Sequence, residues 1–428
     1  MNSRVIISGA GLVSSLGLSA PETWEALFAG RCGIQRIDGF DTQGFDCPAA
    51  AQVHGLGPSE LGILPRDSRI MDKHSYMLMK SSRDAFRQSR LDRGDIAPED
   101  IGYFAGMGMV DYHVEDLLPA VVQSLDQEGC LDYDKFFSGA YQQIHPLWPL
   151  SMLNNINFCQ VAIDLGIKGD NTTFCPHADS GFHAIIEAYN SVLSGKAKAA
   201  LAGGVSEKVS PLSIARGLCF GILNTDNNDD IRCSPFGRDR RGTVLGEGCG
   251  IISLELQSGA EHRGVPSLAA VTGYGVSFQL TEDSHCPTSR AISLAMEQAI
   301  ARANLRPSDI DLIIAHADGT YMGDKHEIEA IHHTFSGCID SVTVFSSKGA
   351  LGHMLAGAAA VDAVLGIYIL QHGIIPAVYA SPLQDETIKF MLVRGKPIKA
   401  DPRRILINSR SYEGQCASLI MEAADNES

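Results

Sequence analysis

The chain has 428 residues and a formal net charge of −16, with 45% hydrophobic and 20% charged residues. This length can bury a sizeable core, as one large domain or two ordinary ones. The acidic balance argues against a general nucleic-acid binder, which needs a basic face. No apolar run reaches the roughly 18 residues that span a bilayer, and no signal-peptide pattern opens the chain. We therefore expect a cytoplasmic protein that binds neither nucleic acid nor membrane.

The 11 cysteines are scattered along the chain, and none forms a C-x-x-C pair. A disulfide framework is not expected in a large chain without a secretory leader. The spacing gives no support to structural zinc either. We expect reduced cysteines that mostly pack as small core residues, and no metal site.

Short apolar runs bounded by glycine alternate with helical patterns along the chain, which favours an α/β architecture with buried strands. The expected strands are, in chain order, Arg4–Gly9, Ile101–Gly106, Ala199–Gly203, Gly250–Leu256, Leu312–His316, Thr343–Ser346 and Arg404–Asn408. A polar stretch at Gln257–Ser267 contains two glycines and a proline. It predicts a boundary between an N-terminal half, residues 1–256, and a C-terminal half, residues 257–428.

The first expected strand is followed by Gly9-Ala10-Gly11, which invites comparison with the dinucleotide-binding motif. The third glycine of G-x-G-x-x-G is missing, because Ser14 stands there. We therefore predict a tight turn after a core strand and no dinucleotide site.

Two segments in the second half each place a histidine beside glycines at an expected strand-to-helix junction. His316 is followed by Asp324 and Glu327, and His353 is preceded by Lys348. Such junctions often carry sites, because a rigid sheet holds the loop backbone. A lone histidine of this kind is more often a core or capping group than a catalyst. Two such junctions and a lysine are less easily explained by packing.

These segments resemble the β-ketoacyl-acyl-carrier-protein synthases, the decarboxylating condensing enzymes of fatty acid and polyketide synthesis. The similarity runs nearly end to end. It also rests on residues 5–17, Ala202-Gly203-Gly204, Ser234-Pro235-Phe236 and Gly246-Glu247-Gly248. The resemblance implies a thiolase-like fold with five layers, αβαβα, in which two similar halves each contain a mixed five-stranded sheet.

The resemblance also assigns roles to the candidate residues. His316 matches the first catalytic histidine, within a degraded form of the family motif H-G-T-G-T. His353 and Lys348 match the second histidine and the lysine of K-x-x-x-G-H, and Asp324 and Glu327 match an acidic pair. In the family, the two histidines donate hydrogen bonds to the malonyl thioester carbonyl and stabilise the enolate formed on decarboxylation. The lysine and the acidic pair position them.

The family's nucleophilic cysteine is missing. It lies in a segment of the type T-A-C-x-x-G-x-H-A-I, and the register set by Gly181 places Ala178 at its position. The chemistry needs a thiolate, which a helix N-terminus helps to form. Alanine cannot hold an acyl chain covalently. Cys175, three residues upstream on the strand side, is not expected to replace it.

Other positions depart from the family as well. Pro176 and His177 replace small residues before the nucleophile position, and Glu413 replaces a glycine of the G-F-G-G turn. Tyr412 falls at the aromatic gate of that turn. The resemblance also places Met107 on the acyl tunnel, where a bulky residue limits chain length; plain core packing of Met107 is the alternative.

We predict a chain-length factor, a condensing-inactive subunit that pairs with an active ketosynthase and shapes its acyl tunnel. Its partners would be that ketosynthase and an acyl carrier protein. It would need no cofactor of its own, because acyl chains arrive on the carrier's phosphopantetheine. One alternative is a malonyl-carrier-protein decarboxylase, although such relatives usually carry glutamine at the nucleophile position. Another is an active synthase with a trapping cysteine-to-alanine substitution, which predicts one departure rather than several. A scaffold without an acyl ligand also stays open.

Overall fold

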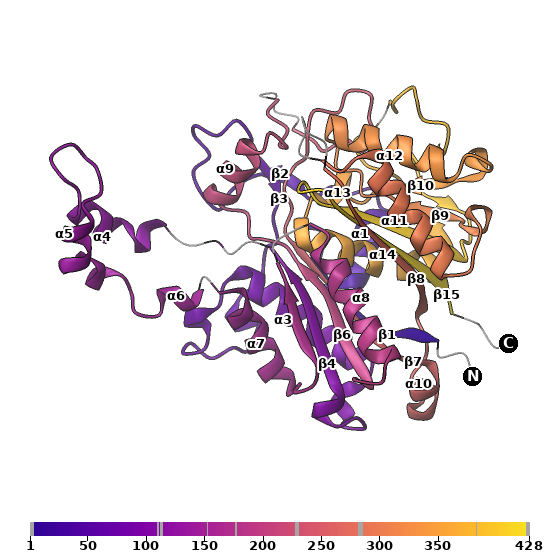
Figure 1. The fold of residues 1–428 in the computed structure, drawn as a ribbon, viewed down its shortest axis with the longest axis horizontal. Coiled ribbons are helices and arrows are strands. Elements are labelled where there is room, and N and C mark those ends of the chain that lie inside the picture. The colour runs from indigo at the N-terminus through magenta and orange to yellow at the C-terminus, as the bar shows by residue number, and fades with distance from the viewer. Residues whose placement is uncertain are drawn as a thin grey trace.

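The strands form one large mixed sheet system with helices on its faces (Figure 1). The structure is a computed structural model and describes residues 4–108, 111, 114–151, 153–175, 178–226, 231–280, 286–381 and 383–424. Strand order in the main sheet is β12-β10-β9-β14-β15-β8-β1-β7-β6-β4-β5.

The first half of the chain contributes five of these strands. They are β1 (Val5–Ser14), β4 (Ile101–Met107), β5 (Asn171–Phe174), β6 (Ala199–Val205) and β7 (Gly248–Leu256). The second half contributes the others. They are β8 (Ala269–Phe278), β9 (Leu312–Ile314), β10 (Thr343–Phe345), β14 (Arg404–Arg410), β15 (Gln415–Ala423) and the short β12 (Met391–Leu392). The two groups join edge to edge where Val5–Ile7 pairs antiparallel with Ala269–Val271.

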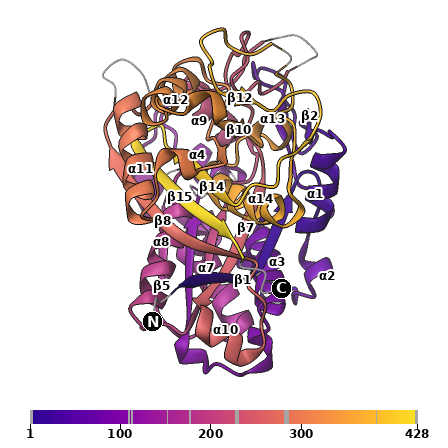
Figure 2. The same cartoon turned by 90° about the vertical axis from the view of Figure 1, so that its right-hand side faces the viewer.

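Helices complete the layers, which Figure 2 shows with α11 and α12 on one side and α1 and α3 on the other. The longer helices of the main body are α1 (Ala20–Phe28), α3 (Lys73–Gln88), α7 (Asn154–Leu165), α8 (Ser180–Leu193), α9 (Pro211–Cys219), α10 (Gln257–Arg263), α11 (Ser289–Arg302), α12 (Tyr321–Thr334) and α14 (Ala358–His372). The single-turn helices there are α2 (Pro58–Leu61) and α13 (Lys348–Leu351). Helices α8 and α14 contact strands of both halves, α3 covers β1 and β7, and α11 covers β8 and β15. This confirms the expected five-layer, thiolase-like arrangement.

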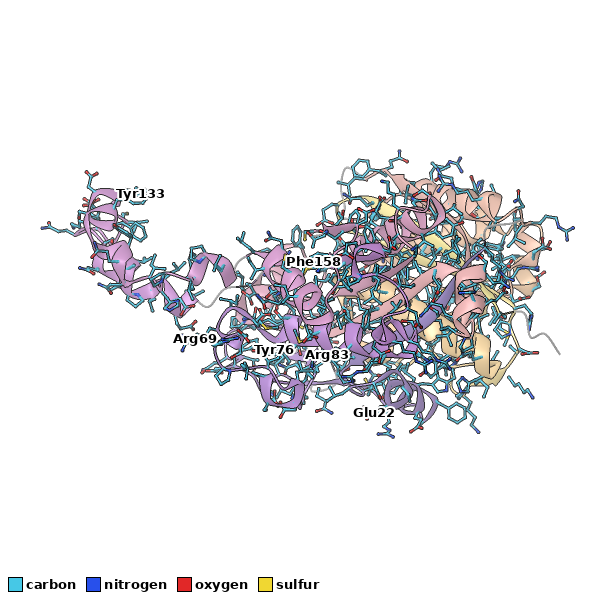
Figure 3. All side chains as sticks on the ribbon, turned by 90° about the horizontal axis from the view of Figure 1, so that it is seen from below. Glu22, Arg69, Tyr76, Arg83, Tyr133 and Phe158 are labelled. Carbon is cyan, nitrogen blue, oxygen red and sulfur yellow. The ribbon has the colours of Figure 1, made fainter. Side chains whose placement is uncertain are left out.

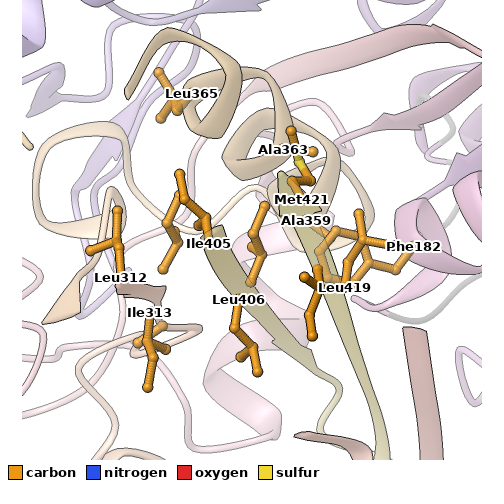
Figure 4. Packing of buried hydrophobic residues seen from close by; sticks show 14 of the residues in the cluster. Phe182, Leu312, Ile313, Ala359, Ala363, Leu365, Ile405, Leu406, Leu419 and Met421 are labelled. Carbon is orange, nitrogen blue, oxygen red and sulfur yellow. The ribbon is translucent and has the colours of Figure 1, made fainter. Parts of the chain in front are cut away.

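Helix α14 contacts strands of both halves and belongs to the largest group of buried apolar residues described. Figure 4 shows Ala363 of this helix close to Met421 of β15. The window Leu355–His372 reaches the length and hydropathy of a membrane span, which the sequence expectation missed. Because 78% of that window is buried in the protein, it has the character of a core helix. The cytoplasmic location stays a prediction.

All seven expected strands form, but the predicted tight turn at Gly9–Gly11 is wrong. Both glycines lie inside β1, with a register shift against β7 between Ile7 and Gly9. Helix α3 packs directly on this strand, and a Cβ on Gly9 would lie 2.3 Å from the Ala85 carbonyl oxygen. The glycines therefore serve close packing of a helix on a strand. The boundary predicted at Gln257–Ser267 carries α10 and stays a prediction.

An arm projects from the body in Figure 1 and in the view from below in Figure 3. It contains α4 (Leu118–Gln123), α5 (Tyr133–Ser138) and α6 (Trp148–Ser151). Large apolar side chains on it are exposed, among them Val122 at 57%, and Tyr133 and Phe137 at 68% each. Exposed apolar side chains gathered on one projecting segment are typical of surfaces that bind a partner.

Candidate functional site

Ala178 lies just before helix α8, at the buried position where a helix N-terminus would stabilise an anion. It is 3% exposed, and its carbonyl oxygen accepts a hydrogen bond from Ser409 Oγ at 3.3 Å. The register predicted for the missing nucleophile therefore falls at a suitable place for one. Pro176 and His177 lie outside the described residues, so their predicted crowding of the site stays a prediction.

The structure brings the two predicted histidines together. His316 follows β9 and His353 follows α13, and both are buried. Their ring centroids lie 4.9 Å apart with the planes at 86°. The backbone N–H of Arg410 donates to His316 Nδ1 at 3.2 Å, so a neutral His316 ring carries its proton on Nε2. That Nε2 and both ring nitrogens of His353 have no hydrogen-bond partner among the described residues.

Both histidines are held neutral. Burial, followed by the positive charge of Lys348, holds the pKa of His316 well below its usual value. The same two causes lower the pKa of His353 to about 3. At neutral pH each ring is therefore an uncharged hydrogen-bond donor and acceptor. This is the form that could donate to a thioester oxygen.

Glu327 fixes the loop that carries the first histidine. Its carboxylate accepts hydrogen bonds from the backbone N–H groups of His316 at 2.9 Å and Ala317 at 2.8 Å. The amide of Asn408 on β14 adds a third at 3.2 Å. The predicted positioning role thus has a geometric basis in the backbone contacts of His316.

Asp324 and Lys348 act from further away. The Asp324 carboxylate accepts from the backbone N–H of Phe236 at 2.7 Å and of Gly319 at 3.2 Å. Burial and the neighbouring Asp318 raise the pKa of Asp324 to about 7. The Lys348 ammonium is buried and lies 3.3 Å from an Asp362 carboxylate oxygen. Its positive charge lowers the pKa values of the two histidines without a direct hydrogen bond to either.

Two charged residues in this site were missed as functional candidates. Asp318 occupies the third position of the degraded H-G-T-G-T motif, and Arg410 lies at the end of β14. Arg410 Nη2 and an Asp318 oxygen are 2.7 Å apart, and the other oxygen accepts from the Tyr412 hydroxyl at 2.7 Å. Burial alone would raise the pKa of Asp318, but Arg410 holds it below its usual range. The sequence signal that could have identified them is their charge, since Asp318 lies in a motif and Arg410 on a buried strand.

His316, Asp318 and His353 each offer a ligand atom within 4.8 Å of the others, as a divalent ion requires. The ligand atoms of these residues do not fit a divalent metal ion. Because His316 Nδ1 accepts from the backbone, a neutral ring has a proton on Nε2 and no lone pair there. Both oxygens of Asp318 are engaged by Arg410 and Tyr412. We assign no metal to this set.

A cavity of about 70 Å³ lies beside Ala178. The residues lining it are Ala178, Glu207, Ser213, Arg216, Gly217, Phe220, Ile222, Leu245, Leu355, Tyr412 and Glu413. Neither His316 nor His353 is among these described lining residues. Tyr412 lies between, with its ring centroid 5.9 Å from that of His353. Met107 is fully buried at the end of β4 and also does not line this cavity, so its tunnel role stays a prediction.

Comparisons with known proteins cover nearly the whole chain. Residues 2–260 match the family model "Beta-ketoacyl synthase, N-terminal domain", and residues 268–380 match "Beta-ketoacyl synthase, C-terminal domain". The 3-oxoacyl-[acyl-carrier-protein] synthase 2 of Staphylococcus aureus (strain N315) is 26% identical over 424 residues, 98% of each chain. That of Coxiella burnetii (strain RSA 493 / Nine Mile phase I) is 27% identical, also over 98% of each.

Solved structures give the same result. The ishigamide ketosynthase/chain length factor matches with a TM-score of 0.86 and 26% identity, over 99% of this chain and 100% of that one. A beta-ketoacyl synthase from Burkholderia phymatum STM815 matches with a TM-score of 0.85 and 23% identity, over the same shares of the two chains. The second likeness is one of fold alone.

The buried neutral histidines predict a specific acid sensitivity. His353 has a pKa of about 3 when folded, whereas an unfolded histidine titrates at about 6.5. Between these values the unfolded chain binds the proton, so stability is complete above about pH 6.5 and falls as the pH is lowered. The contribution of His353 to this loss is about 1.4 kcal/mol per pH unit.

Urea unfolding of wild type and His353→Gln at about pH 7 and about pH 5.5 measures that contribution. We expect a smaller loss of unfolding free energy in His353→Gln. The matched control is His333→Gln, whose histidine side chain is 66% exposed and whose loss should equal that of wild type. An equal loss in all three proteins would show that His353 is not held neutral by burial.

Proposed function

Because this chain belongs to the β-ketoacyl synthase family, we propose that it is a chain-length factor, a condensing-inactive subunit of a ketosynthase complex. It pairs with an active ketosynthase and shapes the acyl tunnel in carrier-protein-dependent polyketide or fatty-acid-like synthesis. The observation that carries this proposal is the methyl group of Ala178, buried before α8 in the lining of a cavity, where the family needs a thiolate.

Cys175 does not offer an alternative nucleophile. Cys175 is exposed as a residue, yet partial burial of its thiol raises the pKa and outweighs the opposing hydrogen bond from the Asn154 amide, 3.0 Å from the sulfur. A thiol with a raised pKa is a weak nucleophile near neutral pH, because the thiolate is the reactive form. Cys175 is also not among the described residues lining the cavity at Ala178. An acyl-enzyme intermediate on Cys175 is therefore disfavoured.

The surroundings of Ala178 speak against a synthase with a single trapping substitution. Asp318, Arg410 and Glu413 all stand in segments where the family motifs carry no such charges, and the first two form a buried pair. A single engineered change would leave these segments in the family's form. The combined changes support a subunit whose own sequence makes it unable to condense.

The surface supports a partner chain. The arm at residues 114–151 exposes apolar side chains, and β5 is the last strand of the sheet with an unpaired edge among the described residues. Both features favour burial against a second chain. The ishigamide relative is a ketosynthase/chain length factor, which supports an active ketosynthase as that chain.

The acyl carrier protein is the proposed source of the acyl chain. The curated relatives from Staphylococcus and Coxiella are synthases named for this carrier. The cavity at Ala178 is walled largely by apolar side chains, among them Phe220, Ile222 and Leu245, and so suits a hydrocarbon chain. Because the phosphopantetheine belongs to the carrier, this chain needs no cofactor of its own.

A malonyl-carrier-protein decarboxylase is the second candidate. The observation in its favour is the retained pair of neutral histidines with a free Nε2 proton on His316. Against it, neither His316 nor His353 is among the described residues that line the cavity at Ala178. We rank it below the chain-length factor for that reason.

Restoring the nucleophile separates these functions. We expect Ala178→Cys alone to recover less than about 1% of the condensation rate of an active ketosynthase, since each 1.4 kcal/mol of lost transition-state stabilisation costs about tenfold. Asp318, Arg410 and Glu413 would still alter the site. The measurement is mass-detected turnover of acyl- and malonyl-carrier protein, with Ala178→Ser as control. Full condensation by an Ala178→Cys homodimer would show instead that the chain is a trapped synthase.

Met107→Ala tests the tunnel role at the end of β4. If Met107 limits the chain, its truncation should lengthen the products of the complex with the active ketosynthase, as read by mass spectrometry. Loss of a buried methionine also costs about 2–5 kcal/mol, so a matched control is needed. Met79→Ala on α3 removes the same atoms from the same core cluster and should leave product length unchanged. Unchanged products in a folded Met107→Ala complex would assign Met107 to core packing alone.

A further inference from the structure

Asp318, Arg410 and Tyr412 form a buried network, 0%, 2% and 7% exposed respectively. One Asp318 oxygen binds Arg410 Nη2 and the other binds the Tyr412 hydroxyl, each at 2.7 Å. The first oxygen also accepts from Thr320, from its backbone N–H at 3.0 Å and its hydroxyl at 2.7 Å. The carboxylate is thus fully engaged, which holds the Tyr412 ring in one place.

The fold provides space for the Arg410 guanidinium. Helix α12 carries Gly323 beside it, and a Cβ there would lie 2.1 Å from Arg410 Nη2. Any larger residue would displace the guanidinium. Asp324 lies 3.7 Å from the same nitrogen and adds a second carboxyl group to the surroundings. The ion pair therefore occupies a fitted site in the core, where a lone charge would be costly.

Tyr412 separates two compartments. On one side it lines the same cavity as Ala178. On the other its ring lies against that of His353, at 5.9 Å between centroids. Neither histidine is among the described residues lining that cavity. The tyrosine ring therefore forms part of the boundary between the cavity and His353, together with Leu245, which lines the same cavity and forms a β-bridge with His353.

We propose that Asp318 and Arg410 fix Tyr412 as a closed wall, so that the subunit admits an acyl chain beside Ala178 and excludes a malonyl thioester from His316 and His353. These are specificity-determining residues, and they deepen the proposed function, on which the identity of the ligands rests. The wall makes the retained histidines structural in this chain.

The negative charge of Asp318 also disfavours decarboxylation at the histidine pair. Its second oxygen lies 3.8 Å from His316 Nε2, the atom that carries the free proton. Decarboxylation of a malonyl thioester releases CO₂ and leaves an enolate, whose negative oxygen would have to sit beside these donors. A carboxylate already at that distance disfavours the enolate, although its ion pair with Arg410 balances much of its charge.

Chemical labelling of the histidines tests the wall. Diethylpyrocarbonate acylates accessible neutral imidazoles, and peptide mass spectrometry measures the rate at each histidine in the complex of full-length chain and ketosynthase. In wild type, we expect His316 and His353 to react at least about tenfold more slowly than the exposed His333, because a buried group reacts only after local opening. Tyr412→Phe keeps the ring but removes its bond to Asp318, and should raise both rates about fivefold or more.

Tyr321→Phe is the matched control, since Tyr321 is 61% exposed and lies outside the wall. It should leave both rates unchanged. Gly323→Ala gives a second route, because it displaces the guanidinium without altering a charge, and it should raise the rates as Tyr412→Phe does. Wild-type His353 reacting as fast as His333, or no increase in either wall variant, would overturn the proposal.

Activity gives an independent readout. Wild type should not decarboxylate malonyl-carrier protein, whereas Asp318→Thr/Arg410→Phe should do so at least about tenfold faster than background. That gain should vanish when His316→Ala is added. The labelling experiment tests only the wall. If the histidines are accessible while this chain still sets the product length, the wall is overturned and the chain-length role stands. Protected histidines in a chain that does not pair with the ketosynthase and does not affect product length would overturn that role and leave the wall.

Discussion

The buried ion pair between Asp318 and Arg410 is the interaction on which the character of this site depends. Removing two charges from water is costly, and the cost is offset only where hydrogen bonds satisfy both groups. Here Asp318 is satisfied on all sides, whereas the Arg410 guanidinium is hydrogen-bonded through Nη2, and its buried Nε and Nη1 have no partner among the described residues. A glycine of α12 leaves room for the guanidinium. The pair then determines where Tyr412 lies, where the acyl cavity ends and which groups the cavity can reach.

The family fold survives intact around this change. The main sheet with its two groups of strands, the buried helices that contact both groups and the loops that carry His316 and His353 are all retained. Even the backbone contacts of Glu327, which hold the first histidine loop, are in place. What is altered is the chemistry at three points: the nucleophile, the surroundings of the enolate site and the gate turn. Such a chain can supply a shaped surface and cavity to a partner without performing the reaction.

The sequence predicted the elements that depend on local pattern and motif register. Seven strands, the histidine pair and the position of Ala178 follow from glycine-bounded apolar runs and from fixed motif spacings. It did not predict β8, where two glycines and polar residues interrupt the apolar run, or β15, where Gln415, Ser418 and Glu422 interrupt it. The tight turn at Gly9–Gly11 was wrong because helix α3, distant in the sequence, packs against that strand.

The ion pair could not be predicted for a similar reason. Asp318 and Arg410 are 92 positions apart, and only the parallel pairing of β9 with β14 brings their segments together. Each residue was visible as a charge in an unexpected place. Their mutual neutralisation, and the bond from Asp318 to Tyr412, are properties of the folded chain. The same holds for the exposed arm, whose isolation from the body no local pattern shows.

The proposed function makes this chain the condensing-inactive subunit of a ketosynthase heterodimer. It is tested most directly by coexpressing the full chain with a cysteine-bearing ketosynthase from its own source, followed by native mass spectrometry during turnover of acyl-carrier protein. The account predicts a one-to-one heterodimer in which the acyl adduct sits on the partner only and product forms only when both chains are present. A stable homodimer of this chain that carries the acyl adduct and condenses by itself would contradict it.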